Sequence, residues 1–377
     1  MSSSDLNRVA VVSAAQTQLC ESWNGRQHVD LIFSAVSDAL RGSGLDIADV
    51  DVVIDCGSDV LDGRSISNCG FLGAMGAHCK EESRVEEDGL WGAAYAMNKI
   101  AAGGAKVALV VAYSKPSESS VAAYYSSIAE PFYQRPVGLD HLSAAGLMAN
   151  QYLAATGLDE DALVDVAAHD WERAAANEWV NTDGAPGKAD VAASDLVAEP
   201  LRAFEVSRPV DGAVAVVLAA EDVARRCAQV PVWLTGAGSA MDSHMLAERK
   251  PGELEACAAA ARSAYRRAGI SEPGRFGIAE VSAGSAAAEL MTLEALDLAV
   301  QGKSTLLYDA SSPIAVNPSG GAIPADPIMA TGLVRLSEAA LQLAGQVDRG
   351  TSGVGSAVVH GAGGLGMQNH CVFTLEV

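Results

Sequence analysis

The chain has 377 residues, of which 47 are acidic and 25 are basic, so its formal net charge is −22 at pH 7. This charge repels phosphate backbones and anionic lipid head groups, which excludes nucleic acid and membrane surfaces as expected partners. Apolar residues make up 49% of the sequence and charged residues 19%, a balance that supports a large buried core and argues against disorder. The length predicts two similar domains in one globule.

Cysteine and histidine usage predicts a reducing compartment and no metal site. The seven cysteines are odd in number, scattered, and contain no CxxC pair, which favours free thiols over disulfides or a zinc site. The histidines show no metal-ligand spacing. Residues 1–8 lack the apolar segment of a signal peptide, and no apolar run approaches the length of a membrane span. We therefore expect a cytoplasmic protein.

Strand and helix signals alternate in the first half, as an α/β protein requires. The expected strands are 9–12, 50–56 and 106–113, and the expected helices are 29–40 and 90–102. Gly44 follows the first helix and Gly103 the second, and glycine readily adopts the left-handed conformation that ends a helix. The predicted order is β-α-β-α-β.

The second half repeats this order and predicts an internal duplication. Its expected elements are a strand over 232–235, a helix over 254–268, a strand over 276–281 and a helix over 287–300. Between the halves, about 114–200 is less strand-like and carries helical patterns at 142–155 and 162–176. We predict an N-terminal domain of residues 1–225 with an inserted loop domain at about 114–200, and a C-terminal domain of residues 226–377.

Several short motifs then occur in one order along the chain. Segments 211–215, 317–321, 330–332 and 360–364 are similar to the SDGAAA, NPSGG, ATG and terminal HNxGxGG motifs of thiolases. The chain resembles this family from Arg8 to Val377, in particular the sterol-carrier-protein type and the bacterial lipid-transfer-protein thiolases. The resemblance implies two duplicated βαβαβ-type domains in five layers, α-β-α-β-α. It also implies a coenzyme A thioester as substrate or ligand, with no covalently bound cofactor.

Thiolases carry an acyl group on a cysteine at a strand-to-helix turn, where the helix N-terminus lowers the thiol pKa. The segment that matches the NxCASG motif is 85–92, and Gly89 stands at the cysteine position. The resemblance therefore implies that the helix start is retained and the nucleophile is lost. Cys69 and Cys79 precede this turn, and either could replace the nucleophile only if the turn were rebuilt.

Two further thiolase motifs are altered. Ser282 and Gly284 occupy the histidine and second-cysteine positions of the HDCF motif, although the helix that follows, 289–296, keeps the family pattern. Asp326 stands in place of the GHP histidine, and an ionised carboxylate cannot donate the same hydrogen bond. His360 is the one histidine of the set that the resemblance retains. The candidate catalytic residues are therefore His360, Ser282 and Asp326.

Two other side chains have a structural interpretation. Glu280 is flanked by apolar residues, which favours a satisfied structural carboxylate over a catalytic one. Some lipid-transfer-type relatives are retro-aldolases with tyrosines at the histidine positions. Here those positions hold Ser282 and Asp326, and Tyr308 lies on another motif, so the aldolase pattern is not matched residue by residue.

Two hypotheses of function follow. The first is an enzyme that makes or breaks a carbon–carbon bond of an acyl-CoA without a covalent intermediate. The second is a non-catalytic subunit that pairs with a cysteine-bearing paralogue, because loss of a nucleophile leaves only about 10³–10⁴-fold acceleration. The family also implies a homodimer or heteromer, with a small OB-fold and zinc-ribbon protein as a further partner. The sequence does not specify the acyl group.

Overall fold

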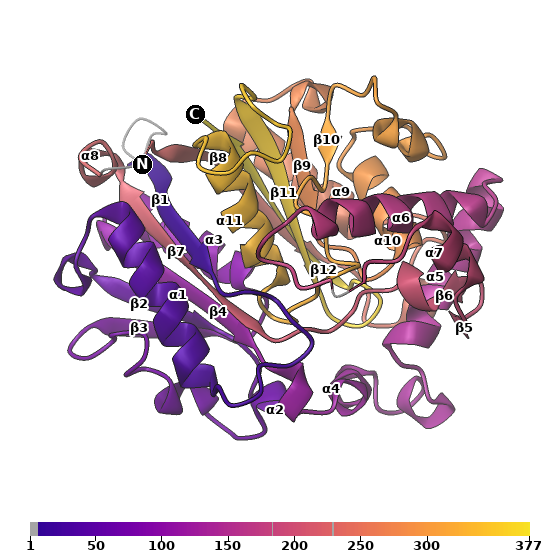
Figure 1. The fold of residues 1–377 in the computed structure, drawn as a ribbon, viewed down its shortest axis with the longest axis horizontal. Helices are drawn as coiled ribbons and strands as arrows, with labels where there is room; N and C mark the ends of the chain where they lie inside the picture. The colour runs from indigo at the N-terminus through magenta and orange to yellow at the C-terminus, as the bar shows by residue number, and fades with distance from the viewer. Residues whose placement is uncertain (1–6, 183, 228–229) are drawn as a thin grey trace.

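The computed structural model describes residues 7–182, 184–227 and 230–377, and its centre is one mixed sheet of ten strands (Figure 1). The first five strands in spatial order come from the first half of the chain: β3 (Glu81–Val85), β2 (Val52–Cys56), β4 (Val107–Ser114), β7 (Gly212–Ala220) and β1 (Val9–Gln16). The other five come from the second half: β8 (Val232–Met241), β12 (Asn369–Glu376), β11 (Ser356–Gly363), β9 (Ile278–Val281) and β10 (Ala315–Val316).

The two groups of strands share one topology. The five strands of each group can be numbered 1 to 5 by their order in the chain. From the outer edge of the sheet to its centre, the spatial order is then 3, 2, 4, 5, 1 in both groups. They meet where β1 pairs antiparallel with β8 over two residue pairs, Ala10 with Trp233 and Val11 with Val232. The shared order supports the duplication that the sequence indicated.

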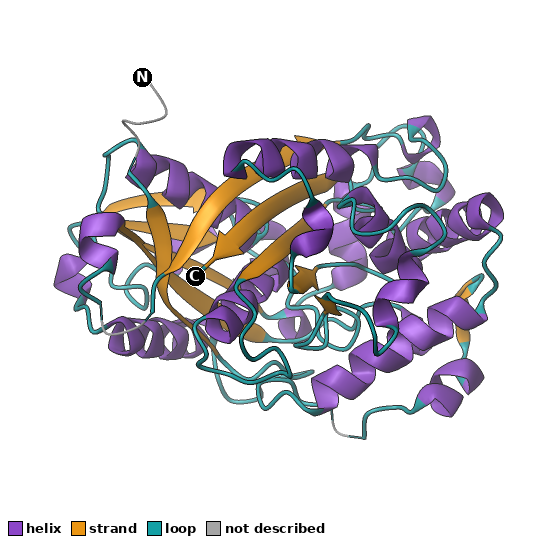
Figure 2. Ribbon diagram, turned by 90° about the horizontal axis from the view of Figure 1, so that it is seen from above, coloured by secondary structure: helices purple, strands orange, loops and turns teal. Residues whose placement is uncertain are grey.

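Helices cover both groups of strands and fill the space between them (Figure 2). The helices α3 (Gly89–Ala101) and α11 (Thr331–Leu343) pack against each other and against strands of both halves. On the outer faces, α1 (His28–Ser43) packs on β1 and β7, and α9 (Glu255–Ala268) packs on β8 and β12. The arrangement is the five-layered α-β-α-β-α fold that the family resemblance implied.

The segment between β4 and β7 is largely helical. It contains α4 (Val121–Ile128), α5 (His141–Thr156), α6 (Asp161–Ala175), α7 (Lys188–Ala193) and the short strands β5 (Leu196–Ala198) and β6 (Leu201–Arg202). Both α5 and α6 pack against α10 (Ala286–Ala295), so this segment lies over the second half of the molecule (Figure 1). These helices agree with the patterns expected at 142–155 and 162–176.

Some expected boundaries differ from the structure. The strand expected at 9–12 continues to Gln16 through a register irregularity between Val11 and Ser13, where small and polar residues hide the strand pattern. The helix expected at 287–300 ends at Ala295, and Asp297 follows with a positive φ of 59°. The strands β3, β7, β11 and β12 and the helix α11 were not anticipated.

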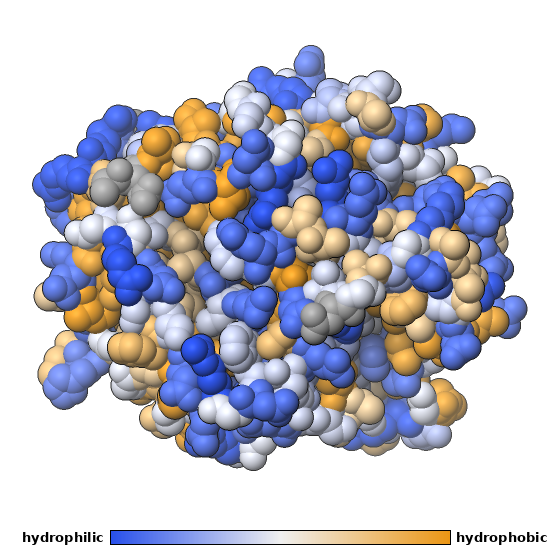
Figure 3. Space-filling view, in the orientation of Figure 1, coloured by the Kyte–Doolittle hydropathy of each residue, from blue (hydrophilic) through white to orange (hydrophobic). Residues whose placement is uncertain are grey.

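The surface in the view of Figure 3 is a mosaic of hydrophilic and hydrophobic residues. Within the described ranges, no helix has the length and apolar character needed to cross a membrane.

Candidate functional site

The two helices of the central layer begin at one carboxylate. Asp88 Oδ1 accepts a hydrogen bond of 2.8 Å from the backbone N–H of Leu90, in the first turn of α3. Its Oδ2 accepts one of 2.8 Å from the backbone N–H of Gly332, in the first turn of α11. Aspartate is a favoured N-cap because its carboxylate satisfies free N–H groups and interacts favourably with the helix dipole. Asp88 therefore joins the N-termini of helices from the two halves of the chain.

A cavity of about 110 Å³ lies beside this junction. Its wall combines the turn before α3, helices α4 and α5, the β9–α10 turn, the segment before α11 and the β11–β12 turn. Its polar lining residues are Glu87, Asp88, Tyr124, Tyr125, His141, Ser207, Ser282, Ser285, Asp326 and Thr331. Residues from distant stretches of sequence thus converge on one small site.

The three carboxyl groups of the cavity all have raised pKa values, and burial is the main cause in each case. Burial raises the pKa of Asp88 to about 7, against the opposing effect of its two backbone hydrogen bonds, and the charges of Glu87 and Asp326 raise it further. Lys and Arg are absent from the described lining residues. Burial therefore favours the neutral forms of these carboxyl groups, and Asp88 among them can exchange a proton near neutral pH.

Short hydrogen bonds orient two of these carboxyl groups. Thr331 Oγ1 donates to Asp326 Oδ1 at 2.5 Å, and the Ser207 side chain also lowers the pKa of Asp326 by hydrogen bonding. Asn369 Nδ2 donates to Glu87 Oε2 at 2.7 Å. These contacts favour the charged forms and so moderate the effect of burial.

Two polar atoms of the lining residues have no hydrogen-bond partner within the described part of the chain. They are Ser282 Oγ, whose residue is 4% exposed, and His141 Nδ1. The His141 ring stacks on Tyr125 at a centroid distance of 4.4 Å, and burial lowers the pKa of this imidazole. A buried polar atom without a partner is costly, so both atoms are candidates to contact a ligand.

The structure brings together two of the three candidates from the sequence and separates the third. Ser282 and Asp326 both line the cavity. His360 is not among the lining residues, because its imidazole is fully buried beside His370 and Cys257 of α9, on the face of β11 that also carries Ala362 of the cavity wall. Burial lowers the pKa of His360 well below its usual range. The buried ring lies beside the backbone of Ser282, behind the cavity wall.

Gly89 is also oriented away from the cavity. A Cβ atom built there would lie 2.7 Å from the Cβ atoms of both Ala112 and Leu333, inside the packing around α3. The preceding residue, Asp88, is the one that lines the cavity at this turn. The motif comparison missed Asp88, although an aspartate directly before a helical run is a recognisable N-cap signal.

The remaining sequence candidates lie elsewhere. Cys69 and Cys79 are exposed and do not line the cavity. Glu280 is fully buried and accepts hydrogen bonds from Ser319 Oγ at 2.6 Å and Gln342 Nε2 at 2.9 Å, as a structural carboxylate should. Tyr308 donates its hydroxyl hydrogen to Glu289 at 2.6 Å, outside the cavity.

Comparisons with known proteins agree with this fold. The family model for the thiolase C-terminal domain-like family matches residues 238–376. An acetyl-CoA acetyltransferase of Methanothermobacter thermautotrophicus is 25% identical over 380 residues, which cover 95% of this chain and 97% of the relative.

Solved structures show the same fold. The Ltp2-ChsH2(DUF35) aldolase matches with a TM-score of 0.81 and 20% identity, covering 99% of this chain and 98% of the other. A monomeric SCP2-thiolase like protein type 1 from Mycobacterium smegmatis matches with a TM-score of 0.74 and 19% identity, covering 98% and 76%. At these identities the likeness concerns the fold alone.

Proposed function

The chain belongs to the thiolase superfamily, and from this premise we propose that it makes or breaks a carbon–carbon bond of an acyl-CoA thioester by proton transfer, without an acyl-enzyme. The observation that carries the proposal is the cavity in which three carboxyl groups with raised pKa values lie at the joined N-termini of α3 and α11. Acid–base groups are present there, whereas a cysteine is absent from the described lining residues.

Retro-aldol cleavage of a 3-hydroxyacyl thioester is a reaction that needs only such groups. A carboxylate removes the proton of the 3-hydroxyl group, the C3–O bond becomes a carbonyl, and the C2–C3 bond breaks. The electron pair of that bond passes into a thioester enolate, which then takes a proton at C2. No group is carried on the protein, so the loss of a cysteine nucleophile leaves this chemistry intact.

Named residues can take the roles that this reaction requires. Asp326 is the proton-transferring group, because it lines the cavity and burial raises its pKa, which makes its carboxylate a stronger base than one in water. The unpartnered Ser282 hydroxyl donates to the thioester oxygen as negative charge develops there. Asp88 positions the two helix starts, because both of its oxygens already accept backbone hydrogen bonds.

The size of the cavity limits what it holds. Pockets for drug-sized ligands are typically about 300–1,000 Å³, whereas this cavity is about 110 Å³. It accommodates the thioester and a short acyl portion, and the nucleotide of coenzyme A stays outside. This also keeps the CoA phosphates away from the carboxyl groups.

A product assay tests the proposal. Purified protein is incubated with a panel of 3-hydroxyacyl-CoA thioesters, and the aldehyde or ketone and the shortened acyl-CoA are quantified by mass spectrometry. We expect cleavage that Asp326→Asn lowers by about 10²–10⁴-fold, the usual contribution of an acid–base group. Glu289→Gln is the matched control, since Glu289 is buried outside the cavity and its pKa is raised well above the usual range, so that glutamine resembles its neutral form. Equal rates in Asp326→Asn and wild type would contradict the assignment.

A second candidate function is a non-catalytic subunit of a heteromeric thiolase or aldolase. The observation that favours it is Asp88, whose two oxygens are both used to join helices at the turn where thiolases place their nucleophile. The Ltp2-ChsH2(DUF35) aldolase is itself named for two components. A cysteine-bearing paralogue or a small OB-fold and zinc-ribbon protein would supply the missing part.

The sheet offers an edge for assembly. Among the described strands, β3 has one neighbour, β2, and lies at the end of the sheet. Exposed edges readily pair with another chain, so this edge supports a homodimer or a heteromer. Light scattering on dilute protein should give at least a dimer, and a stable monomer would remove this part of the proposal. Pull-down from the native host should recover a paralogue if the subunit function holds, and recovery of this chain alone would count against it.

The cysteines support a location in the cytoplasm. All seven are free thiols in the structure, which fits a reducing compartment.

A further inference from the structure

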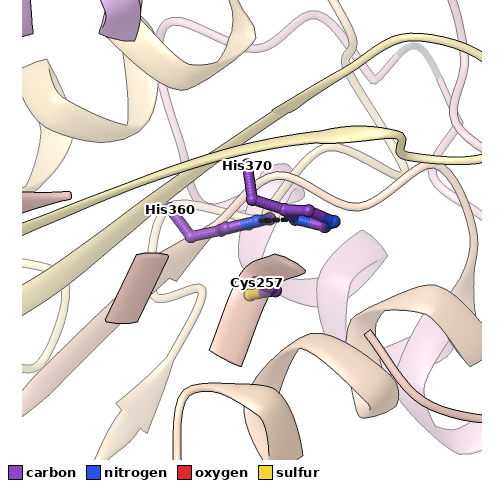
Figure 4. Close-up of side chains that lie close together, drawn as sticks. All are labelled: Cys257, His360 and His370. Carbon is purple, nitrogen blue, oxygen red and sulfur yellow. Dashed lines mark hydrogen bonds between the residues drawn. The ribbon is translucent and has the colours of Figure 1, made fainter. Parts of the chain in front are cut away.

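A cluster of potential metal ligands lies between α9 and the second half of the sheet (Figure 4). It consists of Cys257, His360 and His370, each of which is 0% exposed. One ligand atom from each residue lies within 4.8 Å of the other two. The nearest pair is His360 Nε2 and His370 Nδ1, which are 3.0 Å apart.

The strand register explains why the two imidazoles meet. In the antiparallel pair β11–β12, His360 lies opposite Val372 and His370 lies opposite Ala362. The two histidines are thus diagonal neighbours on one face of the sheet, and α9 places Cys257 against that face. Cys371 points to the opposite face, into the core beside α3 and α11.

We propose that Cys257, His360 and His370 form a binding site for a transition-metal cation that prefers thiolate and imidazole ligands, with zinc as the first candidate. Zinc in proteins is bound by cysteine sulfur at about 2.3 Å and by histidine nitrogen at about 2.0–2.1 Å. Two nitrogens on a tetrahedral zinc lie about 3.3–3.4 Å apart, so the imidazole pair needs only a small separation. The sulfur lies within 4.8 Å of both nitrogens and must move closer to complete the site.

Metal binding requires neutral imidazoles and a deprotonated thiol. A bound cation replaces the thiol proton, which is released to solvent, and the metal–thiolate bond offsets the cost of burying the charge.

The outer nitrogens of the two imidazoles, His360 Nδ1 and His370 Nε2, have no hydrogen-bond partner within the described residues. The backbone of Ser282 lies beside the first ring and that of Met367 beside the second. Metal-bound histidines usually donate the outer N–H to a carbonyl, carboxylate or water, so metal binding requires that each ring gain such a contact.

The site would act on the structure and not on the reaction. It links α9 to β11 and β12, and the end of β11 with the turn that follows it, 362–367, contributes to the wall of the cavity. The alternative is a metal-free pair in which one imidazole donates a hydrogen bond to the other while Cys257 fills apolar space.

Refolding with metal distinguishes these two possibilities, because a fully buried site must be filled as the chain folds. The full chain is refolded anaerobically with Zn²⁺ or Co²⁺, desalted, and analysed for metal content, thiolate-to-cobalt charge-transfer absorption and Tm. We expect one equivalent of metal, a charge-transfer band and a higher Tm than in metal-free protein.

Cys257→Ala should remove the charge-transfer band and lower the affinity by about 100-fold or more. Cys371→Ala is the matched control, because Cys371 is as buried as Cys257 but lies on the face of β12 opposite to His370. This variant should keep the charge-transfer band and the metal stoichiometry. The proposal is overturned if wild-type protein shows no charge-transfer band, or if Cys257→Ala binds metal as wild type does. The wild-type spectrum alone decides the matter if Cys257→Ala does not fold.

Discussion

Buried carboxyl groups in the central part of the molecule differ in their partners: Glu280 lies in an ion pair, whereas Asp88 and Asp326 line the cavity. Glu280 lies 3.2 Å from Arg335 Nη1 and accepts further hydrogen bonds from Ser319 and Gln342. The cavity carboxyls Asp88 and Asp326 form no ion pair with a Lys or Arg of the described residues, although the more distant charge of Arg335 lowers the pKa of Asp326, and burial raises the pKa of both. A buried carboxylate with a cation supports the fold, whereas buried carboxyls without one remain able to exchange protons.

The largest expected effect follows from breaking the buried ion pair between Glu280 and Arg335. Arg335→Met leaves Glu280 charged and buried without its cation, and removal of one partner of a buried ion pair costs about 3–5 kcal/mol. Chemical denaturation should show that loss. Arg41→Met removes an exposed ion pair with Asp38 and should cost less than about 1 kcal/mol. Equal losses in the two variants would show that Glu280 is not held as an ion pair.

The pH dependence of stability tests the cavity carboxyls, which have no ion-pair partner. Folding raises the pKa of Asp88 from 3.8 to about 7, so the folded protein binds this proton more tightly than the unfolded chain. The contribution of Asp88 to the free energy of unfolding is therefore most favourable below pH 4. It falls as the pH rises to about 7 and is constant above that pH. Each unit of pKa shift corresponds to about 1.4 kcal/mol.

Asp88→Asn provides the measurement, because asparagine does not titrate. The difference in unfolding free energy between wild type and the variant should shrink as the pH rises from 4 to 7. Parallel curves over this range would mean that Asp88 is already ionised in the folded protein at pH 4.

A smaller effect is expected at Gly89. The added side chain of Gly89→Cys would collide with Ala112 and Leu333, and overpacking of a core typically costs about 1–3 kcal/mol. Gly89→Ala should cost a similar amount, since the collision begins at Cβ. Neither wild type nor Gly89→Cys should thiolyse acetoacetyl-CoA with free CoA. Normal thiolysis by the cysteine variant would show that the new thiol reaches the cavity.

The sequence predicted several elements with a clear pattern and missed others. Helices α1 and α9 were found because their apolar periodicity ends at a glycine with positive φ, Gly44 and Gly269. Strand β3 was missed because its sequence, Glu81–Val85, is polar. Helix α11 was missed although Arg335, Glu338 and Gln342 recur on it at helical spacing, and all of its residues are buried.

The site was only partly predictable for a related reason. Of the residues that motif order selected, Ser282 and Asp326 line the cavity. Motif order does not specify how deeply a side chain is buried, and the imidazole of His360 lies behind the wall, beside His370 and Cys257. His141 and Tyr125 come from helices far from these motifs, and only the folded chain brings them to the cavity.

Deuterium exchange tests the central claim most directly, because it detects proton transfer at the thioester without knowledge of the natural acyl group. Saturated short-chain acyl-CoA thioesters are incubated with the protein in D₂O, and deuterium at C2 is measured by mass spectrometry. We predict exchange above the protein-free rate that Asp326→Asn lowers at least tenfold and Glu289→Gln leaves unchanged. No exchange above background, or equal exchange in wild type and Asp326→Asn, would contradict proton transfer by the cavity carboxyls.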